Sequence, residues 1–252
     1  MKKIILILIF AYLNSFAQDC PTRIGDFEIN STNLDDLKLI LPLYTISSMS
    51  NIKNADDYQV YKVEHEELDD EYSGGYFAYE VKPDLENIKS WYNVEIANPN
   101  DSTRVFFIPS YKVDDVVIKN VLLKFYNNQL YFIRASLTKS YADIILEKYK
   151  GKGHKSEEKK TPNACKNVKF KRYPNIFSQY FFSSTENKIR AMLTFDFKIN
   201  KYCETVINDR IEIFDFDIYI REGDKIIANL EKLKKEQEEK KKFEKEEKLK
   251  KF

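Results

Sequence analysis

Residues that commonly build catalytic and metal sites are scarce in this sequence. Its 252 residues include two histidines, three cysteines, one tryptophan and six glycines. No two cysteines are close in sequence, and His65 and His154 are far apart, so a zinc site has no basis. The same scarcity leaves no framework for Ser-His-Asp or Cys-His catalysis, and no glycine-rich phosphate loop is present. We therefore expect no enzyme and no cofactor.

The apolar run near the start of the chain is too short to cross a membrane. Ile4–Leu13 would span roughly 15 Å as a helix, whereas a bilayer core is about 30 Å thick. Because two lysines precede this run, it is typical of a signal peptide. Ser15 and Ala17 provide the small side chains of a cleavage site. We predict a signal peptide at residues 1–17 and a mature chain that starts at Gln18 without a transmembrane anchor.

A lipoprotein is the competing interpretation, because Cys20 closely follows the predicted cleavage site. Lipoprotein signals place a small residue directly before the modified cysteine, and this chain has Asp19 there. The sequence therefore favours a periplasmic or secreted protein in which Cys20 is an ordinary thiol.

Export changes how the cysteines are interpreted, because disulfides form in oxidising compartments. Three cysteines allow one bridge. Cys165 and Cys203 both lie in the strand-rich second half of the chain, so we predict that these two are joined. Cys20 is then the spare thiol, on an N-terminal end that we expect to be mobile.

Aromatic content and alternating patterns favour a sheet-rich domain. The chain has 18 phenylalanines and 17 tyrosines, which suit half-buried strands. Over residues 188–199, apolar side chains alternate with polar ones, as in an antiparallel sheet with one wet face. Two short helices are expected within 32–41 and 138–150. Residues 18–222 are thus predicted to form one exported α+β domain, rich in antiparallel sheet.

Individual residues predict several turns and boundaries. Asn127 and Asn128 separate two β-rich runs and suit the left-handed positions of a type I′ turn. Pro109 has no backbone N–H, so the strand around it is expected at a sheet edge. Thr32 is the expected cap of the first helix, and the last strand is expected to extend over 210–220.

Residues 105 apart match in several places, with strand, polar cap and helix in the same order twice. The pairs are Phe27 and Phe132, Ser31 and Ser136, Ile40 and Ile145, Leu41 and Leu146, and Tyr44 and Tyr149. A duplicated strand-helix-strand unit is one explanation and chance is the other, because apolar residues match easily. Over roughly residues 24 to 221, this element order resembles the tandem arrangement of β-lactamase-inhibitor-like proteins and related small outer-membrane assembly lipoproteins. The resemblance implies a protein that binds other proteins and catalyses nothing.

The net charge of +1 hides strong local asymmetry. Between Asp56 and Glu71, eight acidic residues face one lysine, a net charge of −7. Between Lys148 and Arg172, nine lysines and one arginine face two glutamates, a net charge of +8. We expect this basic segment to contact an anionic partner, and export argues against nucleic acid. Its candidate contact residues are Lys152, Lys155, Lys159, Lys160, Lys169, Lys171 and Arg172.

Residues 223–252 are predicted to form a Lys/Glu-rich helical tail. From Glu231 on there are ten lysines and seven glutamates, and six of these glutamates have a lysine four residues later. Such pairs stabilise a helix by about 0.2–0.5 kcal/mol each. Polar residues occupy the positions that a coiled coil would need to be apolar. We interpret the tail as a solubiliser, with a tether to an anionic surface as the alternative.

Two carboxylates leave an enzymatic alternative open. Asp215 and Asp217 would share one side of the last strand, and paired carboxylates serve acid/base chemistry or bind a metal. A solvated sheet face explains them more simply, because nothing nearby in sequence completes a site. We therefore expect an exported, non-catalytic binding protein that contacts a protein or envelope component. The alternative is a carboxylate-based hydrolase or a metal-dependent enzyme.

Overall fold

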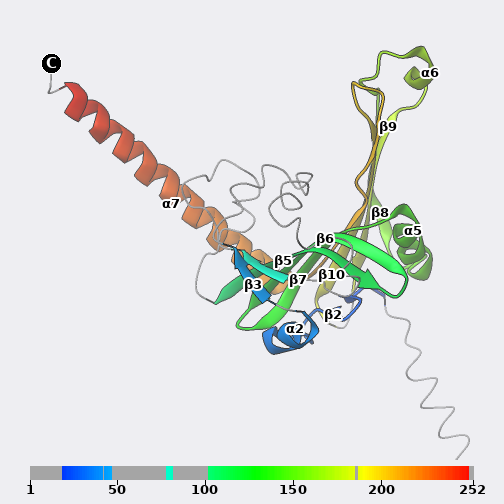
Figure 1. Ribbon diagram of the computed structural model, residues 1–252, viewed down its shortest axis with the longest axis horizontal. Coiled ribbons are helices and arrows are strands. Elements are labelled where there is room, and N and C mark those ends of the chain that lie inside the picture. The colour runs from blue at the N-terminus through cyan, green and yellow to red at the C-terminus, as the bar shows by residue number, and fades with distance from the viewer. Residues whose placement is uncertain (1–18, 42, 47–77, 82–101, 185–186, 250–252) are drawn as a thin grey trace, which may run out of the picture.

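A broad sheet forms the centre of the molecule (Figure 1). The computed structural model describes residues 19–41, 43–46, 78–81, 102–184 and 187–249. In these ranges the strand order is β3-β4-β5-β6-β7-β12-β10-β9-β8, and β11 also pairs with β10. Every pair is antiparallel except β3 with β4. The strands are β3 (Leu43–Ile46), β4 (Ala78–Val81), β5 (Thr103–Val113), β6 (Val116–Tyr126), β7 (Gln129–Ser136), β8 (His154–Thr161), β9 (Asn175–Ser183), β10 (Ile189–Ile199), β11 (Thr205–Ile207) and β12 (Arg210–Asp215).

Helices and a small two-stranded sheet complete the described part of the chain. The small sheet pairs β1 (Arg23–Ile24) with β2 (Phe27–Glu28). The helices are α2 (Leu34–Ile40), α5 (Lys139–Lys148), α6 (Val168–Lys171) and α7 (Phe216–Leu249). The predicted fold class is confirmed, because the architecture is α+β, rich in antiparallel sheet, with a long charged helix at its C-terminal end.

The central strands bury side chains on both faces of the sheet. In β5, Phe106 and Ile108 belong to one buried cluster, while Val105 and Phe107 belong to a second. Because successive side chains of a strand point to opposite faces, each face needs its own covering layer. The N-terminal segment, α2 and α5 cover the first cluster, and the start of α7 packs on the second.

Cys20 is fully buried in the first cluster. It is a free thiol, as predicted, but the expectation of a mobile end is wrong for the chain from Asp19 onward. Burial raises the pKa of the Cys20 thiol to about 12. Because the thiolate is the reactive form, this cysteine is chemically inert at neutral pH.

The cap of α2 is Asn33 rather than the expected Thr32. The Asn33 side chain accepts hydrogen bonds from the backbone N–H groups of Asp35 and Asp36, at 2.8 and 3.0 Å. The Asp36 side chain accepts from the Asn33 N–H at 2.8 Å, which completes a capping box. The Thr32 hydroxyl accepts from the Glu28 N–H instead, at 2.8 Å, and so closes the turn before the helix.

The predicted hairpin turn between β6 and β7 is confirmed. Asn127 has φ 48° and Asn128 has φ 65°, so both take the left-handed conformation that a type I′ turn requires. Tyr126 pairs with Gln129 across the turn. The turn sets the register of the first two pairs, and an irregularity between Lys124 and Phe125 then shifts the pairing by one residue.

The prediction that β5 is an edge strand is wrong, because β5 lies between β4 and β6. Pro109 is tolerated there because the described part of β4 pairs with β5 only at Phe106 and Phe107. The missing N–H of Pro109 thus falls beyond that pairing.

The last strand ends earlier than predicted. β12 stops at Asp215 and α7 begins at Phe216, so the strand expected over 210–220 is correct only in its first half. The Asp215 side chain accepts a hydrogen bond from the Ile218 N–H at 3.0 Å, and this bond caps the helix. The other carboxylate oxygen accepts from Asn30 Nδ2 at 2.9 Å. A single aspartate thus ends the strand and starts the helix.

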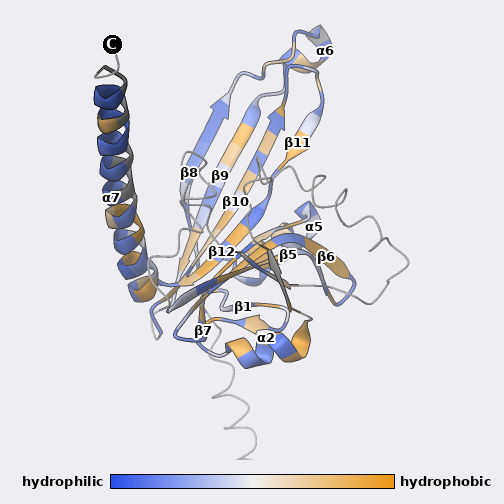
Figure 2. Ribbon diagram, turned by 60° about the vertical axis from the view of Figure 1, so that its left-hand side comes forward, coloured by the Kyte–Doolittle hydropathy of each residue, from blue (hydrophilic) through white to orange (hydrophobic). Residues whose placement is uncertain are grey.

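The first turns of α7 belong to the packed domain. The Tyr219 ring stacks on Phe132 with centroids 5.7 Å apart. Glu222, only 1% exposed, accepts hydrogen bonds from Thr103 Oγ1 at 2.9 Å and from Lys225 Nζ at 2.8 Å. α7 is continuous across the domain boundary expected after residue 222. Its later turns project from the body and are mostly hydrophilic (Figure 2).

β8, β9, β10 and β11 extend away from the body as an arm that ends near α6 (Figures 1 and 2). Near the body, Ile189, Ala191 and Leu193 of β10 are buried, which confirms the predicted alternation. Farther out, Phe195 and Phe197 continue the same apolar face but are only half-buried. The hydrophobic core of the body therefore does not continue along this face of the arm.

The two matched units start their helices 105 residues apart, at Leu34 and Lys139. However, β2 pairs in the small sheet, whereas β7 lies in the middle of the large one. The units share element order but not position in the sheet, and duplication stays a prediction.

We expect Cys20 to resist alkylation in the native protein. A maleimide reagent at neutral pH should label no cysteine before unfolding and one cysteine after unfolding without reductant, because two are in the disulfide. Intact mass spectrometry counts the labels. Fast labelling of the native protein would show that Cys20 is accessible.

Glu222→Ala should lower the free energy of unfolding by about 1.5–3 kcal/mol, the range for hydrogen bonds to a charged group. The control is Glu236→Ala in the exposed part of α7, where the pair with Lys232 spans 3.9 Å. This control substitution should lower the free energy of unfolding by only about 0.2–0.5 kcal/mol. Both losses are measured by chemical denaturation, and equal losses would show that the start of α7 is outside the cooperative fold.

Candidate functional site: the basic tip and the cleft at its base

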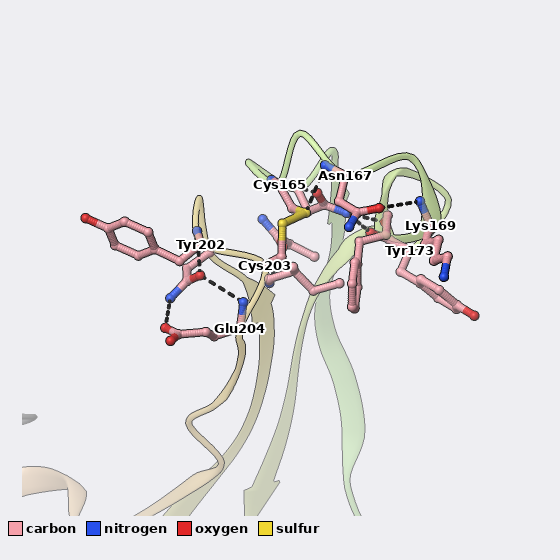
Figure 3. The surroundings of a disulfide bond; sticks show 12 residues. Cys165, Asn167, Lys169, Tyr173, Tyr202, Cys203 and Glu204 are labelled. Atoms are coloured by element: carbon pink, nitrogen blue, oxygen red, sulfur yellow. Dashed lines mark hydrogen bonds between the residues drawn. A yellow bond between two sulfur atoms is a disulfide. The ribbon is translucent and has the colours of Figure 1, made fainter.

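A disulfide closes the end of the arm (Figure 3). It joins Cys165, in the loop before α6, to Cys203, in the loop between β10 and β11, with Cα atoms 4.9 Å apart. The predicted pairing is confirmed. The bond links segments 38 residues apart in sequence, at a place where the covering layers of the body do not reach.

Asparagine side chains hold the two loops on either side of the disulfide. Asn163 Nδ2 donates to the Phe170 carbonyl at 2.7 Å, and Asn163 Oδ1 accepts from the Cys165 N–H at 2.9 Å. In the other loop, Asn200 Oδ1 accepts from two backbone N–H groups, at 2.9 and 3.0 Å. These bonds satisfy backbone groups that have no sheet partner. The end of the arm therefore has a defined shape.

The structure divides the seven predicted contact residues among three places. Lys152 lies before β8 and pairs with Asp19 of the body at 2.7 Å. Three lysines of β8 pair with Glu157 or Glu158 of the same strand; they are Lys155, Lys159 and Lys160. The remaining three lie in α6 or directly after it; they are Lys169, Lys171 and Arg172. Within the described part of the chain, only this last group has no ion pair with a carboxylate.

The β8 lysines have a structural explanation. β8 is the outermost strand on its side of the sheet, and it contains three lysines and two glutamates. Charged side chains on an edge strand prevent other chains from pairing with it. We therefore retain the prediction of partner contacts only for the cations at the end of the arm.

Two exposed tyrosines flank the positive charges at this end. Tyr202 is 70% exposed and Tyr173 is 46% exposed, and they point to opposite sides of the disulfide (Figure 3). The Arg172 guanidinium lies 5.0 Å from the Tyr173 ring, and Lys201 Nζ lies 4.9 Å from the Tyr202 ring. We define the basic tip as Lys166, Lys169, Lys171, Arg172, Tyr173, Lys201 and Tyr202.

The basic tip has an uncompensated positive charge. It contains five cations, and the loops that carry it, residues 162–174 and 200–204, contain one acidic residue, Glu204. The Glu204 side chain accepts a hydrogen bond from Asn200 Nδ2 at 2.8 Å. The net charge of the two loops is therefore +4.

Sequence inspection missed Lys201 and Tyr202, because both lie far along the chain from the basic segment. The signal that could have found them is the predicted disulfide, since Cys203 is adjacent to Tyr202. Any residue next to that cysteine must lie beside the basic segment once the bridge forms.

A second candidate site is a cleft of about 510 Å³ at the base of the arm. Its volume is within the range of small-molecule sites, about 300–1,000 Å³. Strands β6, β7, β9, β10, β11 and β12 contribute to it, together with residues between β11 and β12 and residues after β7. Its polar lining includes Asn120, Arg134, Thr194, Asp196, Asp209 and Arg210. The sequence indicated that Thr194 and Asp196 share a wet face, but not that this face is hollow.

Asp209 is the most deeply buried carboxyl group of the cleft, at 4% exposure. It accepts a hydrogen bond from the Asp196 N–H at 3.3 Å. Burial is the main reason that the pKa of Asp209 is raised, and repulsion from Asp143 and Asp196 adds to it, while Lys139 opposes it. This carboxyl group is therefore more easily protonated than an exposed aspartate.

The other predicted site residues do not come together. Asp215 caps α7, whereas Asp217 lies inside the helix and pairs with Lys188. The idea of a carboxylate pair on one strand face is therefore wrong, because the strand ends between them. The acidic segment 56–71 lies outside the described residues. Over the ranges that are described, no three His, Cys, Asp or Glu side chains are grouped to hold a metal.

Comparison of the chain with protein-family models, with curated proteins and with solved structures found no match. Among the helices that the structure describes, none combines the length and apolar character needed to span a bilayer. The fold and the two candidate sites are therefore interpreted from their own geometry.

Asp209→Asn should stabilise the protein at neutral pH. Because the pKa of Asp209 is raised in the folded state, ionisation of this carboxyl group costs more free energy there than in the unfolded state. The protein is therefore less stable above the raised pKa than it is below the ordinary pKa of about 3.9. Asparagine removes this penalty and keeps the oxygen that accepts from Asp196.

We expect the melting temperature to rise by a few degrees, since about 1 kcal/mol corresponds to roughly 2–4 °C in a chain of this size. The gain should disappear as the pH falls below about 4, where the wild-type carboxyl group is protonated in both states. The exposed Asp115→Asn is the control. A lower melting temperature for Asp209→Asn would show that the ionised carboxylate stabilises the fold.

Proposed function

We propose that the protein is an exported, non-catalytic binding protein whose basic tip contacts an anionic partner, either a protein or an envelope component. One observation carries this proposal: five cations and two exposed tyrosines are held at the end of a projecting arm by a disulfide. Nucleic acid is not a partner in this proposal, because the chain is expected to leave the cytoplasm.

The disulfide and the buried thiol support export without lipid attachment. A structural disulfide is typical of oxidising compartments, which agrees with a signal peptide at residues 1–17 and a periplasmic or secreted location. Cys20 is packed in the core, where a lipid on its sulfur would not fit. We therefore keep Gln18 as the proposed mature N-terminus.

The composition of the basic tip suits a binding surface. Clustered positive charge speeds association with anionic partners and orients them. Tyrosine and arginine are enriched at protein interfaces, where they combine apolar contact with hydrogen bonding. Because the disulfide and the asparagines already order the loops, a partner need not order them on binding.

α7 contributes less net charge to such a contact. From Glu231 to the end of α7, eight lysines nearly balance seven glutamates. We propose that this helix keeps the protein in solution, with a spacer or a tether to an anionic surface as the alternative. The element order that resembles β-lactamase-inhibitor-like proteins also favours binding over catalysis.

Neutralising the basic tip should weaken binding to anionic probes. The test variant replaces Lys169, Lys171 and Arg172 with glutamine. The control variant replaces Lys38, Lys112 and Lys150, which are exposed lysines of the body, with glutamine. Both variants lose three positive charges. Lys38 and Lys150 of the control each pair with a carboxylate, whereas the three tip cations have no ion pair among the described residues.

Binding is measured by co-sedimentation with phosphatidylglycerol vesicles and by retention on polyglutamate resin, at low and at moderate salt. The wild type and the control should bind at least one probe in a salt-sensitive manner, and the tip variant should lose about tenfold in affinity or more. Equal binding of the two variants, or no binding of the wild type to either probe, would contradict the proposal.

A further inference from the structure

Three buried polar atoms in the lining of the cleft have no hydrogen-bond partner in the described structure. They are Asn120 Oδ1, Asp196 Oδ1 and Arg210 Nε. Buried polar atoms in native proteins are nearly always paired, so each such atom calls for an explanation. Two acceptors and one donor around one cavity can pair with a molecule that both donates and accepts hydrogen bonds.

The two unpaired oxygens belong to side chains whose terminal torsions turn easily. The terminal torsions of asparagine and aspartate have broad energy wells, so their oxygens can turn without movement of the backbone. Asn120 also has a left-handed backbone, with φ 52°, at an irregular position in the pairing of β6 with β7. This irregularity moves its amide out of the regular sheet pattern at the wall of the cleft.

Two charged side chains of the cleft have partners of opposite charge. Asp196 Oδ2 pairs with Lys198 Nζ at 2.6 Å. Arg210 Nε lies 3.5 Å from Glu212 Oε1, which is close enough to neutralise charge but lacks hydrogen-bond geometry. Lys119 and Arg134 also line the cleft, so these pairs compensate only part of its charge. Hydrogen bonding, rather than charge, is what the unpaired atoms of the cleft offer a ligand.

The cleft also has an apolar part. Phe177, Val117 and Ile207 contribute to its lining, and the last two are 40% and 49% exposed. Thr194 and Ser136 also contribute hydroxyl groups to the lining. The lining thus combines aliphatic and aromatic contact with groups that bind hydroxyls, because a hydroxyl both donates and accepts.

We propose that the cleft at the base of the arm binds a small, neutral, polyhydroxylated ligand, namely one or two sugar residues. The C–H face of a sugar ring fits the apolar side, and its hydroxyls satisfy Asn120, Asp196 and Arg210. This inference is independent of the proposed function, because the basic tip lies at the far end of the arm and selects for negative charge.

The test is an NMR titration of the ¹⁵N-labelled full chain. The probes are glucose, N-acetylglucosamine, cellobiose and chitobiose, with glucuronate as the charged counterpart. We expect saturable shifts at the amides of Thr194, Asp196 and Asn208 with at least one neutral probe. Signals of the basic tip should not move.

Asn120→Gly removes the unpaired oxygen while suiting the left-handed backbone. It should weaken binding of that probe by about tenfold, the effect expected when one hydrogen bond is lost. The matched control is Asn128→Gly, which makes the same change at a left-handed asparagine of the β6–β7 turn, outside the cleft. This control should bind like the wild type.

Several outcomes would overturn the proposal. One is the absence of saturable shifts with all four neutral probes. Others are shifts that lie away from the cleft, or binding that Asn120→Gly leaves unchanged. Tighter binding of glucuronate than of the neutral sugars would show that the cleft is a site for anions. Each of these results leaves the basic tip and its proposed function untouched.

Discussion

Burial of β7 and β12 on both faces is the constraint on which the rest of the structure depends. These neighbouring strands contribute Ile133 and Ile213 to one buried cluster, and Phe132 and Phe214 to the other. A sheet with two apolar faces is stable only if both are covered. The N-terminal segment supplies one layer, which is why Cys20 is buried. The chain supplies the other by leaving the sheet at Asp215 and returning over it as α7.

The arm follows from the same constraint, because it is the part of the sheet that neither layer covers. Apolar burial cannot hold its outer loops, and covalent and side-chain-to-backbone bonds take over that role. Because these loops lie outside the core, they expose charged and aromatic side chains without any loss of core packing. The two candidate sites therefore lie where the covering layers end: the cleft at the margin of the body, and the basic tip beyond it.

The sequence predicted features that depend on local patterns, and failed where distant segments meet. Alternation in β10, the two left-handed asparagines and the disulfide partners were all predictable, because each rests on neighbouring residues or on composition. The end of β12 was not, since residues 214–220 alternate as a strand would. Only the cap that Asp215 forms with Ile218 reveals the helix. The cleft was equally hidden, because its lining combines β6 and β7 with β9 to β12, which lie far apart in the chain.

The position of β12 has a consequence for how the chain reaches this structure. β12 is the last strand in sequence, yet it is inserted between β7 and β10. Until it is in place, the facing edges of those two strands have unpaired backbone groups, which favour aggregation. The strand order therefore requires residues 210–215 before the central sheet can close.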